Sequence, residues 1–175
     1  MTNAGAKALK PFTMAPGTRQ TVLMNDLIPN TDFSTKVTAN LQIIAERAMY
    51  WGAGTPLGEA CHDSIGLAGP HTTFYLPDGQ TSEGRETYTL IANPNNTSVQ
   101  VMVSYLLSDG TGAGYFIAGV PANSRATFDM SDKIPSGRAS VVVTCQTAGK
   151  KILAERSMYW NHRGVGTNTV GDWSH

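Results

Sequence analysis

Apolar and polar residues alternate along most of the C-terminal two thirds of the chain. From Val99 to Leu107, valine, tyrosine and leucine take every second position, which is the period of a strand with one buried face. Residues 125–130 follow the same pattern, and residues 86–93 form another strand that ends in an Asn-Pro-Asn-Asn turn. Residues 140–145 form a continuous apolar run that is typical of a central strand. No window shows a sustained helical period. The pattern predicts about seven strands, at 72–76, 86–93, 99–107, 115–118, 125–130, 140–145 and 151–158.

A seven-residue word occurs twice in the chain. Residues 45–51 and 154–160 both read Ala-Glu-Arg-x-Met-Tyr-Trp, with six identities in seven positions, 109 positions apart. Further matches flank the word on both sides and pair these ranges: 16–21 with 122–127, 26–29 with 132–135, and 62–66 with 167–171. A period of about 105–110 residues is the size of an immunoglobulin-like sandwich module.

The repeat predicts the domain organisation. The 175 residues hold only about one and two thirds such periods. We therefore expect an all-β protein with antiparallel, immunoglobulin-like β-sandwich architecture: residues 1–69 as a partial module and residues 70–175 as a complete one. The partial copy lacks counterparts of residues 72–114, so its sheet edges and one face would stay open. Preceding residues, a neighbouring copy of the chain or the second module could complete it.

Charge and composition narrow the range of partners. Thirteen Lys and Arg residues balance thirteen Asp and Glu residues, whereas nucleic-acid and anionic-membrane binding favour a basic face. No apolar run approaches the ~20 residues of a membrane-spanning helix. We expect no nucleic-acid partner and no membrane insertion. The first residues lack a signal-peptide pattern, and we expect the segment to belong to a longer exported chain, located at the cell surface or outside the cell.

Four segments, at 74–79, 87–110, 120–130 and 152–160, carry a family resemblance. With their Asn-Pro-Asn, Pro-Ala-Asn-Ser-Arg and Glu-Arg-x-Met-Tyr motifs, they resemble a repeat found in multiples in large exported bacterial, notably actinobacterial, surface proteins. The resemblance implies an immunoglobulin-like sandwich used in tandem, without catalytic residues. One departure is Cys61, which replaces the glycine that precedes the family's His-x-Ser-Ile-Gly motif.

Two Glu-Arg pairs are the most prominent polar candidates: Glu46 with Arg47, and Glu155 with Arg156. Neighbouring residues on a strand point to opposite faces, so neither pair is a catalytic acid and base side by side. We expect structural roles, in which arginine stacks on tryptophan or binds carbonyl groups and glutamate pairs with another strand.

The aromatic ends of both words admit two hypotheses. Aromatic side chains with a polar group suit either a packing surface between consecutive modules or a platform for polysaccharide. The candidate residues are Met49, Tyr50, Trp51, Met158, Tyr159 and Trp160.

We expect no catalytic residue, no cofactor and no metal site. The histidine and aspartate spacings fit no compact ligand motif, and no Gly-x-Ser-x-Gly turn is present. A disulfide between Cys61 and Cys145 is left open.

The function expected from these patterns is a non-enzymatic structural, assembly or adhesion module of an exported cell-surface protein, fibre or stalk. Two alternatives remain: an extracellular glycan-binding module of a larger protein, and a self-polymerising filament subunit that uses strand complementation. The expected partners are neighbouring modules or copies of the same chain, or polysaccharide under the glycan hypothesis.

Overall fold

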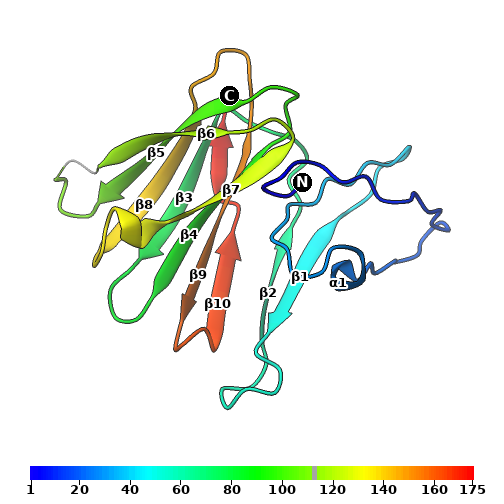
Figure 1. The fold of residues 1–175 in the computed structure, drawn as a ribbon, viewed down its shortest axis with the longest axis horizontal. Coiled ribbons are helices and arrows are strands. Elements are labelled where there is room, and N and C mark those ends of the chain that lie inside the picture. Colours follow the sequence, from blue (N-terminus) through cyan, green and yellow to red (C-terminus); the bar gives the residue numbers. More distant parts are fainter. Residues whose placement is uncertain (112–113) are drawn as a thin grey trace.

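The structure is a computed structural model that describes residues 1–111 and 114–175. Two antiparallel sheets packed face to face form its larger part (Figure 1). The four-stranded sheet has the order β10-β9-β4-β7, with β4 at Glu86–Asn93, β7 at Ser124–Asp129, β9 at Leu153–Trp160 and β10 at Val165–Thr169. The five-stranded sheet has the order β11-β3-β8-β5-β6, with β3 at Thr73–Gln80, β5 at Val99–Leu107, β6 at Tyr115–Val120, β8 at Arg138–Cys145 and β11 at Asp172–Ser174. The predicted all-β antiparallel sandwich class is confirmed.

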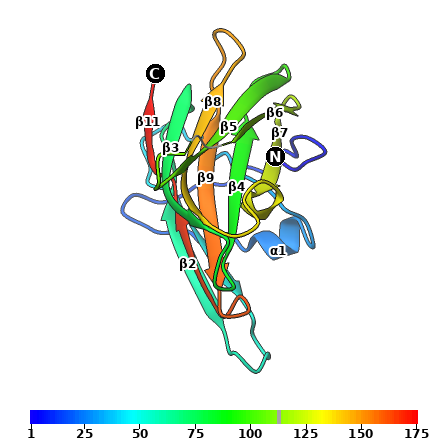
Figure 2. The ribbon, with the colours of Figure 1, turned by 90° about the vertical axis from the view of Figure 1, so that its left-hand side faces the viewer.

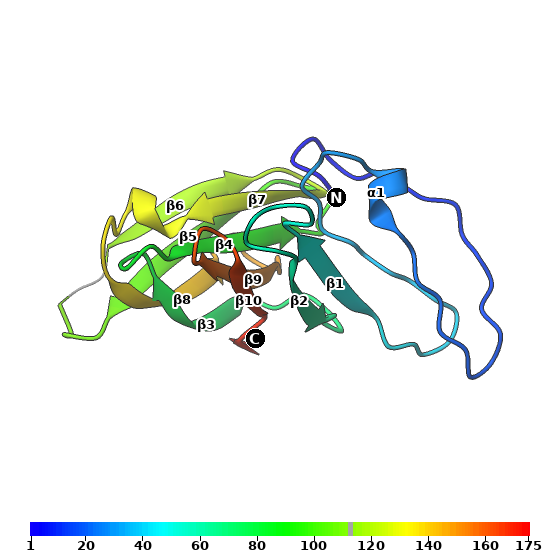
Figure 3. The ribbon, with the colours of Figure 1, turned by 90° about the horizontal axis from the view of Figure 1, so that it is seen from below.

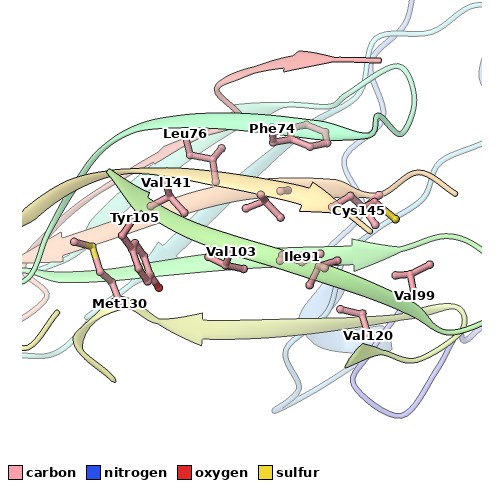
Figure 4. Close-up of a cluster of buried hydrophobic side chains, with 14 of the residues drawn as sticks. Phe74, Leu76, Ile91, Val99, Val103, Tyr105, Val120, Met130, Val141 and Cys145 are labelled. Carbon is pink, nitrogen blue, oxygen red and sulfur yellow. The ribbon is translucent and has the colours of Figure 1, made fainter. Parts of the chain in front are cut away.

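The core lies between the two sheets and follows the alternation of the sequence. Val99, Val101, Val103 and Tyr105 on β5 are fully buried, whereas the residues between them are more exposed (Figure 4). Phe74 of β3 meets the same cluster. The other buried members of this core are Leu76, Ile91, Val120, Met130, Ala139, Val141, Val143, Cys145, Ile152 and Ala154.

Two expected strand boundaries differ from the structure. The strand expected at 125–130 ends at Asp129, because the Asp129 carboxylate accepts a hydrogen bond from the Ser131 amide and caps a 3-10 turn, η1 (Met130–Asp132). Met130 thereby turns into the core. The expected strand at 72–76 extends to Gln80 through an irregularity between Leu76 and Gly79.

The described part of residues 70–175 contains nine strands rather than about seven. The additional strands are β10 and β11. Val165–Thr169 is polar and contains a glycine, so it shows no apolar alternation, and β11 has only three residues. Figure 2 shows β11 beside β3 at the edge of the five-stranded sheet.

Residues 1–65 form no second sandwich. They contain one antiparallel hairpin, β1 (Glu46–Trp51) with β2 (Ala60–Ile65), and one short helix, α1 (Met24–Leu27). Figures 1 and 3 show the hairpin beside β9 and β10, with the blue N-terminal segment looping away from the sandwich. The segment returns to the sandwich at its start, where the Arg125 amide donates to the Thr2 carbonyl (3.3 Å).

The hairpin β1–β2 has the same register as the hairpin β9–β10. Trp51 lies opposite Ala60, and Trp160 lies opposite Val165. Further along, Tyr50 faces Cys61 as Tyr159 faces Gly166, Met49 faces His62 as Met158 faces Thr167, and Arg47 faces Ser64 as Arg156 faces Thr169. Cys61 therefore stands at the position of Gly166.

Corresponding side chains differ strongly in exposure. Ile43 is 43% exposed whereas Ile152 is fully buried, and Met49 is 37% exposed whereas Met158 is 6% exposed. The sandwich therefore leaves apolar side chains of the first copy uncovered. Cys61 is exposed and Cys145 is buried, and both are free thiols rather than a disulfide.

Candidate functional site

Strand β9 presents opposite faces to the core and to the hairpin. Its inward residue Arg156 is 5% exposed, and its guanidinium donates to the backbone carbonyl of Asp78. Asp78 adopts a left-handed conformation (φ 60°) within the irregular part of β3. Burial lowers the pKa of Arg156, an effect that Asp78 partly opposes. Arg156 is thus a structural group inside the sandwich.

An ion pair joins the hairpin to the outward face of β9. Arg47 Nη1 of β1 donates to Glu155 Oε1 at 2.9 Å. The Arg47 and Glu155 side chains are 36% and 22% exposed. A partly exposed pair of this kind contributes about 1 kcal/mol or less to docking, so it orients the hairpin more than it holds it.

Three aromatic rings form the centre of the contact. The ring centroid of Trp51 lies 5.2 Å from that of His62 and 5.5 Å from that of Tyr159, the latter edge-to-face. His62 Nε2 lies 3.3 Å from Tyr159 Oη. Such aromatic pairs add about 0.5–1.5 kcal/mol each beyond their buried area.

Burial is the main cause that lowers the pKa of His62. The nearby Arg47 lowers it further, while Glu155 and Asp63 act in the opposite direction. Because His62 is only 8% exposed, its neutral form suits the packed contact.

Gly166 provides the space that Trp51 occupies. A Cβ atom at Gly166 would lie 3.0 Å from two ring carbons of Trp51 and 2.8 Å from Tyr159 Cδ1. No positive φ requires glycine here, so the requirement is steric. We call the set Arg47, Trp51, His62, Glu155, Tyr159 and Gly166 the hairpin contact.

The turn between β9 and β10 closes one end of the hairpin contact. Asn161, His162 and Arg163 all have positive φ (54°, 53° and 63°), a conformation that costs non-glycine residues roughly 1–2 kcal/mol each. This backbone aims the Arg163 carbonyl at Trp51, whose indole N–H donates to it. The Arg163 guanidinium turns back to the sandwich and donates to Glu86 from Nε at 2.9 Å.

Glu86 and Tyr88 bind the Arg163 side chain at this end of the hairpin contact. Hydrogen bonding from Arg163 holds the pKa of Glu86 below its usual value. Burial, followed by the hydrogen bond to Glu86, raises the pKa of Tyr88 to about 12. The group therefore stays as carboxylate, guanidinium and neutral phenol around neutral pH.

A second anchor lies on β7. Arg125 is 3% exposed, its Nη2 donates to Thr127 Oγ1 at 2.6 Å, and its Nη1 lies 3.6 Å from an Asp32 carboxylate oxygen. Burial lowers the pKa of Arg125, and Asp32 opposes the shift. The pair ties the N-terminal segment to the four-stranded sheet.

The candidate residues separate into three groups. Arg47, Trp51, Glu155 and Tyr159 meet in the hairpin contact, and Met49 lies beside it on the same face of β1. Arg156 and Met158 are buried, and Trp160 lies 5.9 Å from the Arg85 guanidinium. Glu46 and Tyr50 occupy the opposite, solvent-facing side of the hairpin, with Tyr50 66% exposed. The six Met, Tyr and Trp residues therefore do not form one continuous platform.

Two residues of the hairpin contact, His62 and Gly166, are absent from the sequence-based candidates, and so is Arg163 of the adjoining turn. Aligning β2 with β10 by the repeat places Cys61 on Gly166 and His62 on Thr167. The sequence signal for Gly166 was therefore that the matched position in the first copy holds the larger residue Cys61. Nothing local in the sequence marks Arg163, whose role depends on an unusual turn.

Other site types have no counterpart in the part of the chain that the structure describes. Within 1–111 and 114–175, no three His, Cys, Asp or Glu side chains are grouped as metal ligands. No described helix has the length and apolar character needed to cross a membrane. A hollow of about 470 Å³ lies on the outer face of the five-stranded sheet, lined by residues that include Tyr75, Leu106 and Asp172 but none of the candidates above.

Comparisons with known proteins bear on the fold alone. No family model matches the chain, and no curated protein matches it. The crystal structure of Thermotoga maritima 1070 is similar, with a TM-score of 0.52 and 15% identity, covering 62% of this chain and 97% of that one. The Anabaena sensory rhodopsin transducer gives a TM-score of 0.41 and 17% identity, covering 51% of this chain and 97% of its own, and supports no argument. The class defined by the fold is an all-β antiparallel sandwich with an additional docked hairpin.

Proposed function

We propose that the chain is a non-enzymatic structural module of an exported cell-surface protein, fibre or stalk. Residues 70–175 would be a complete immunoglobulin-like unit and residues 1–69 part of another, joined by the hairpin contact. The observation that carries the proposal is that two copies of one sequence word meet there. Arg47 and Trp51 of the first copy contact Glu155 and Tyr159 of the second.

Most polar groups of the contact bind one another, while Arg47 Nε and Nη2 and His62 Nδ1 are buried without a hydrogen-bond partner. Arg47 pairs with Glu155, the Trp51 indole N–H binds the Arg163 carbonyl, and His62 meets the Tyr159 hydroxyl. A catalytic base or nucleophile needs access to substrate, whereas His62 is 8% exposed. The geometry therefore favours a joint over an active site.

Export is supported by the sequence rather than by the contact. The internal repeat and the resemblance to exported bacterial repeats favour it. Antibodies raised against residues 70–175 should label intact cells of the source organism. Labelling only after permeabilisation would contradict a surface location.

The joint is tested by filling the space at Gly166. Gly166→Ala should displace Trp51 and release the hairpin, because the new methyl group would overlap the indole ring. Gly119→Ala is the matched control, since its Cβ meets only a side-chain nitrogen of Gln100 at 3.6 Å. We expect Gly166→Ala to speed amide exchange in residues 46–65 and to increase the maximum dimension in X-ray scattering.

A second variant guards against damage to the sandwich itself. Trp51→Ala leaves residues 70–175 unchanged and should release the hairpin in the same way. Unchanged exchange at 46–65 in both variants would overturn the proposed joint. Esterase, glycosidase or peptidase activity in the native chain that Arg47→Ala abolishes would overturn the non-enzymatic assignment.

A further inference from the structure

One edge of β1 is unpaired among the described residues. The sheet that contains β1 has only two strands. The Gly66 amide donates to the Ala45 carbonyl at 2.8 Å, and hydrogen bonds to one neighbour alternate along an antiparallel strand. Residues 45, 47, 49 and 51 therefore bond to β2. Glu46, Ala48 and Tyr50 direct their backbone N–H and C=O groups to the free edge.

The free edge lacks three common forms of protection, and Glu46 and Arg47 are the two charged residues of β1. Exposed edges are commonly blocked by proline, lysine or a bulge. The six residues of β1 include neither proline nor lysine, and their register with β2 is continuous. The edge is therefore a regular template for one further strand.

The sandwich shows which kind of strand fits this template. In β9, the counterparts of Glu46, Ala48 and Tyr50 are Glu155, Ser157 and Tyr159. Their partners on β4 are, in turn, Leu90, Tyr88 and Glu86. Because β1 and β9 share the Glu-Arg-x-Met-Tyr-Trp sequence, an edge strand with the pattern of β4 would meet nearly the same side chains on β1.

Residues 1–65, which include β1, leave many apolar side chains exposed. Among the described residues, 14 of the 20 large apolar side chains that are exposed lie in residues 1–65. Continuing the offset of 106 residues that pairs 26–29 with 132–135 aligns Val37 with Val143. Val37 is 54% exposed, whereas Val143 is fully buried between the sheets. A strand with the pattern of β4 would set its apolar residues Tyr88 and Leu90 opposite Ala48 and Glu46, as they lie opposite Ser157 and Glu155 in the sandwich.

A second copy of this chain is a poor source of that strand. Its β4 lies between β7 and β9 and is hydrogen-bonded on both edges. Lending β4 to another chain would open its own sandwich. The occupant must therefore be a different polypeptide segment that carries the strand pattern of β4.

We propose that the free edge of β1 is an acceptor site for such a segment, which adds a β4-type strand antiparallel to Glu46–Trp51. The proposal rests on the assembly function proposed above and specifies the partner: an extended strand with alternating apolar side chains. Backbone hydrogen bonds would supply affinity, and the alternating side chains would supply specificity.

The probe is a synthetic peptide of residues 84–94, added to the full chain. We expect it to slow amide exchange of Ala48 and Tyr50 by roughly tenfold or more at saturation, because their N–H groups would become hydrogen-bonded. A peptide N-methylated at Tyr88, the partner position of Ala48, should not bind. N-methylation at Thr89, whose N–H would point away from β1, is the matched control and should leave binding largely intact. Absence of protection by the unmodified peptide would overturn the proposal.

A variant of the chain tests the same edge from the other side. Ala48→Pro removes an N–H that makes no bond to β2, so the hairpin should persist while peptide binding is lost. Binding that survives this substitution would overturn the proposal. A chain that dimerises alone in light scattering, and is made monomeric by Ala48→Pro, would also overturn it, because the occupant would then be a second copy.

The two proposals fail in different ways. Peptide binding is measured at Ala48 and Tyr50, whereas docking is measured through Gly166→Ala. Loss of peptide binding with a docked hairpin would reject strand acceptance alone. A hairpin unaffected by both Gly166→Ala and Trp51→Ala would reject the joint alone.

Discussion

Arg47 and Arg156 occupy the same place in the repeated word but lie in different surroundings. Arg156 points into the sandwich and binds a backbone carbonyl, whereas Arg47 crosses to another strand and binds Glu155. The sequence correctly indicates that Glu155 and Arg156 should face opposite sides, because strand alternation is local. It could not indicate which partner each charge would find. That depends on how the hairpin lies on β9.

His62 gives the hairpin contact a dependence on pH. Its folded-state pKa is lowered by burial and by Arg47, so the unfolded or undocked form binds a proton first as pH falls. The contact should be fully stable above the ordinary histidine pKa of about 6.5 and should weaken as pH falls through and below that value. Amide exchange in residues 46–65, compared at pH 7.5 and 5.5 after correction for intrinsic rates, measures this.

The matched variants are His62→Gln and His71→Gln. Glutamine at 62 can still hydrogen-bond to Tyr159 but does not titrate, so the acid sensitivity should disappear. His71 stacks on Trp173, away from the hairpin contact, and its replacement should leave the acid sensitivity unchanged. Equal acid sensitivity in all three proteins would show that His62 is not the responsible group.

At the scale of elements, prediction succeeded for two kinds of strand. On β5 the apolar alternation matches the burial, whereas the buried face of β4 includes Thr87 and Thr89 and the strand is marked by the turn that follows it. The strands expected at 86–93 and 99–107 match β4 and β5. The sequence-based prediction missed β10. Its residues are polar, because the strand lies at the edge of its sheet and one of its faces meets Trp51. The hairpin contact was only partly foreseeable for the same reason. Its aromatic residues recur in the sequence, but its glycine is recognised only once a tryptophan lies against it.

Two aligned valines, Val143 and Val37, test whether their parts of the chain are packed around a buried core. Val143 lies on β8 and is fully buried, so Val143→Ala should lower the free energy of unfolding by about 2 kcal/mol through lost burial and a residual cavity. Val37, its counterpart, is 54% exposed, and Val37→Ala should change stability by no more than about 0.5 kcal/mol. Urea unfolding monitored by circular dichroism measures both. A comparable loss for Val37→Ala would indicate that residues 1–45 are packed in solution.

At the scale of the whole molecule, the chain combines two parts of unequal stability. The sandwich contains the buried core, whereas residues 6–45 form no strand and are mostly exposed in the structure. Regions with little buried apolar surface open at a lower free energy than the core. Residues 6–45 should therefore open before the sandwich does when the protein is heated or exposed to denaturant.

Limited proteolysis should reveal this difference. Thermolysin cleaves before large apolar residues, and exposed candidates such as Phe12, Leu23 and Leu41 lie in this segment. We expect early cuts between residues 6 and 45 and a persistent fragment that contains residues 70–175, identified by mass spectrometry. Simultaneous loss of both parts would show that they unfold as one cooperative unit.

Cys61 gives the hairpin contact a further consequence. The contact joins two different surfaces, so units linked through it would run in a fixed direction and could not close into a two-fold pair. Gly166 leaves room for a tryptophan on the receiving surface, but the corresponding place on the first hairpin carries the Cys61 side chain. A row of units joined through such contacts would therefore end at the first hairpin, because Cys61 leaves no room there for the tryptophan of another unit. Cys61 alone would set the end of the row.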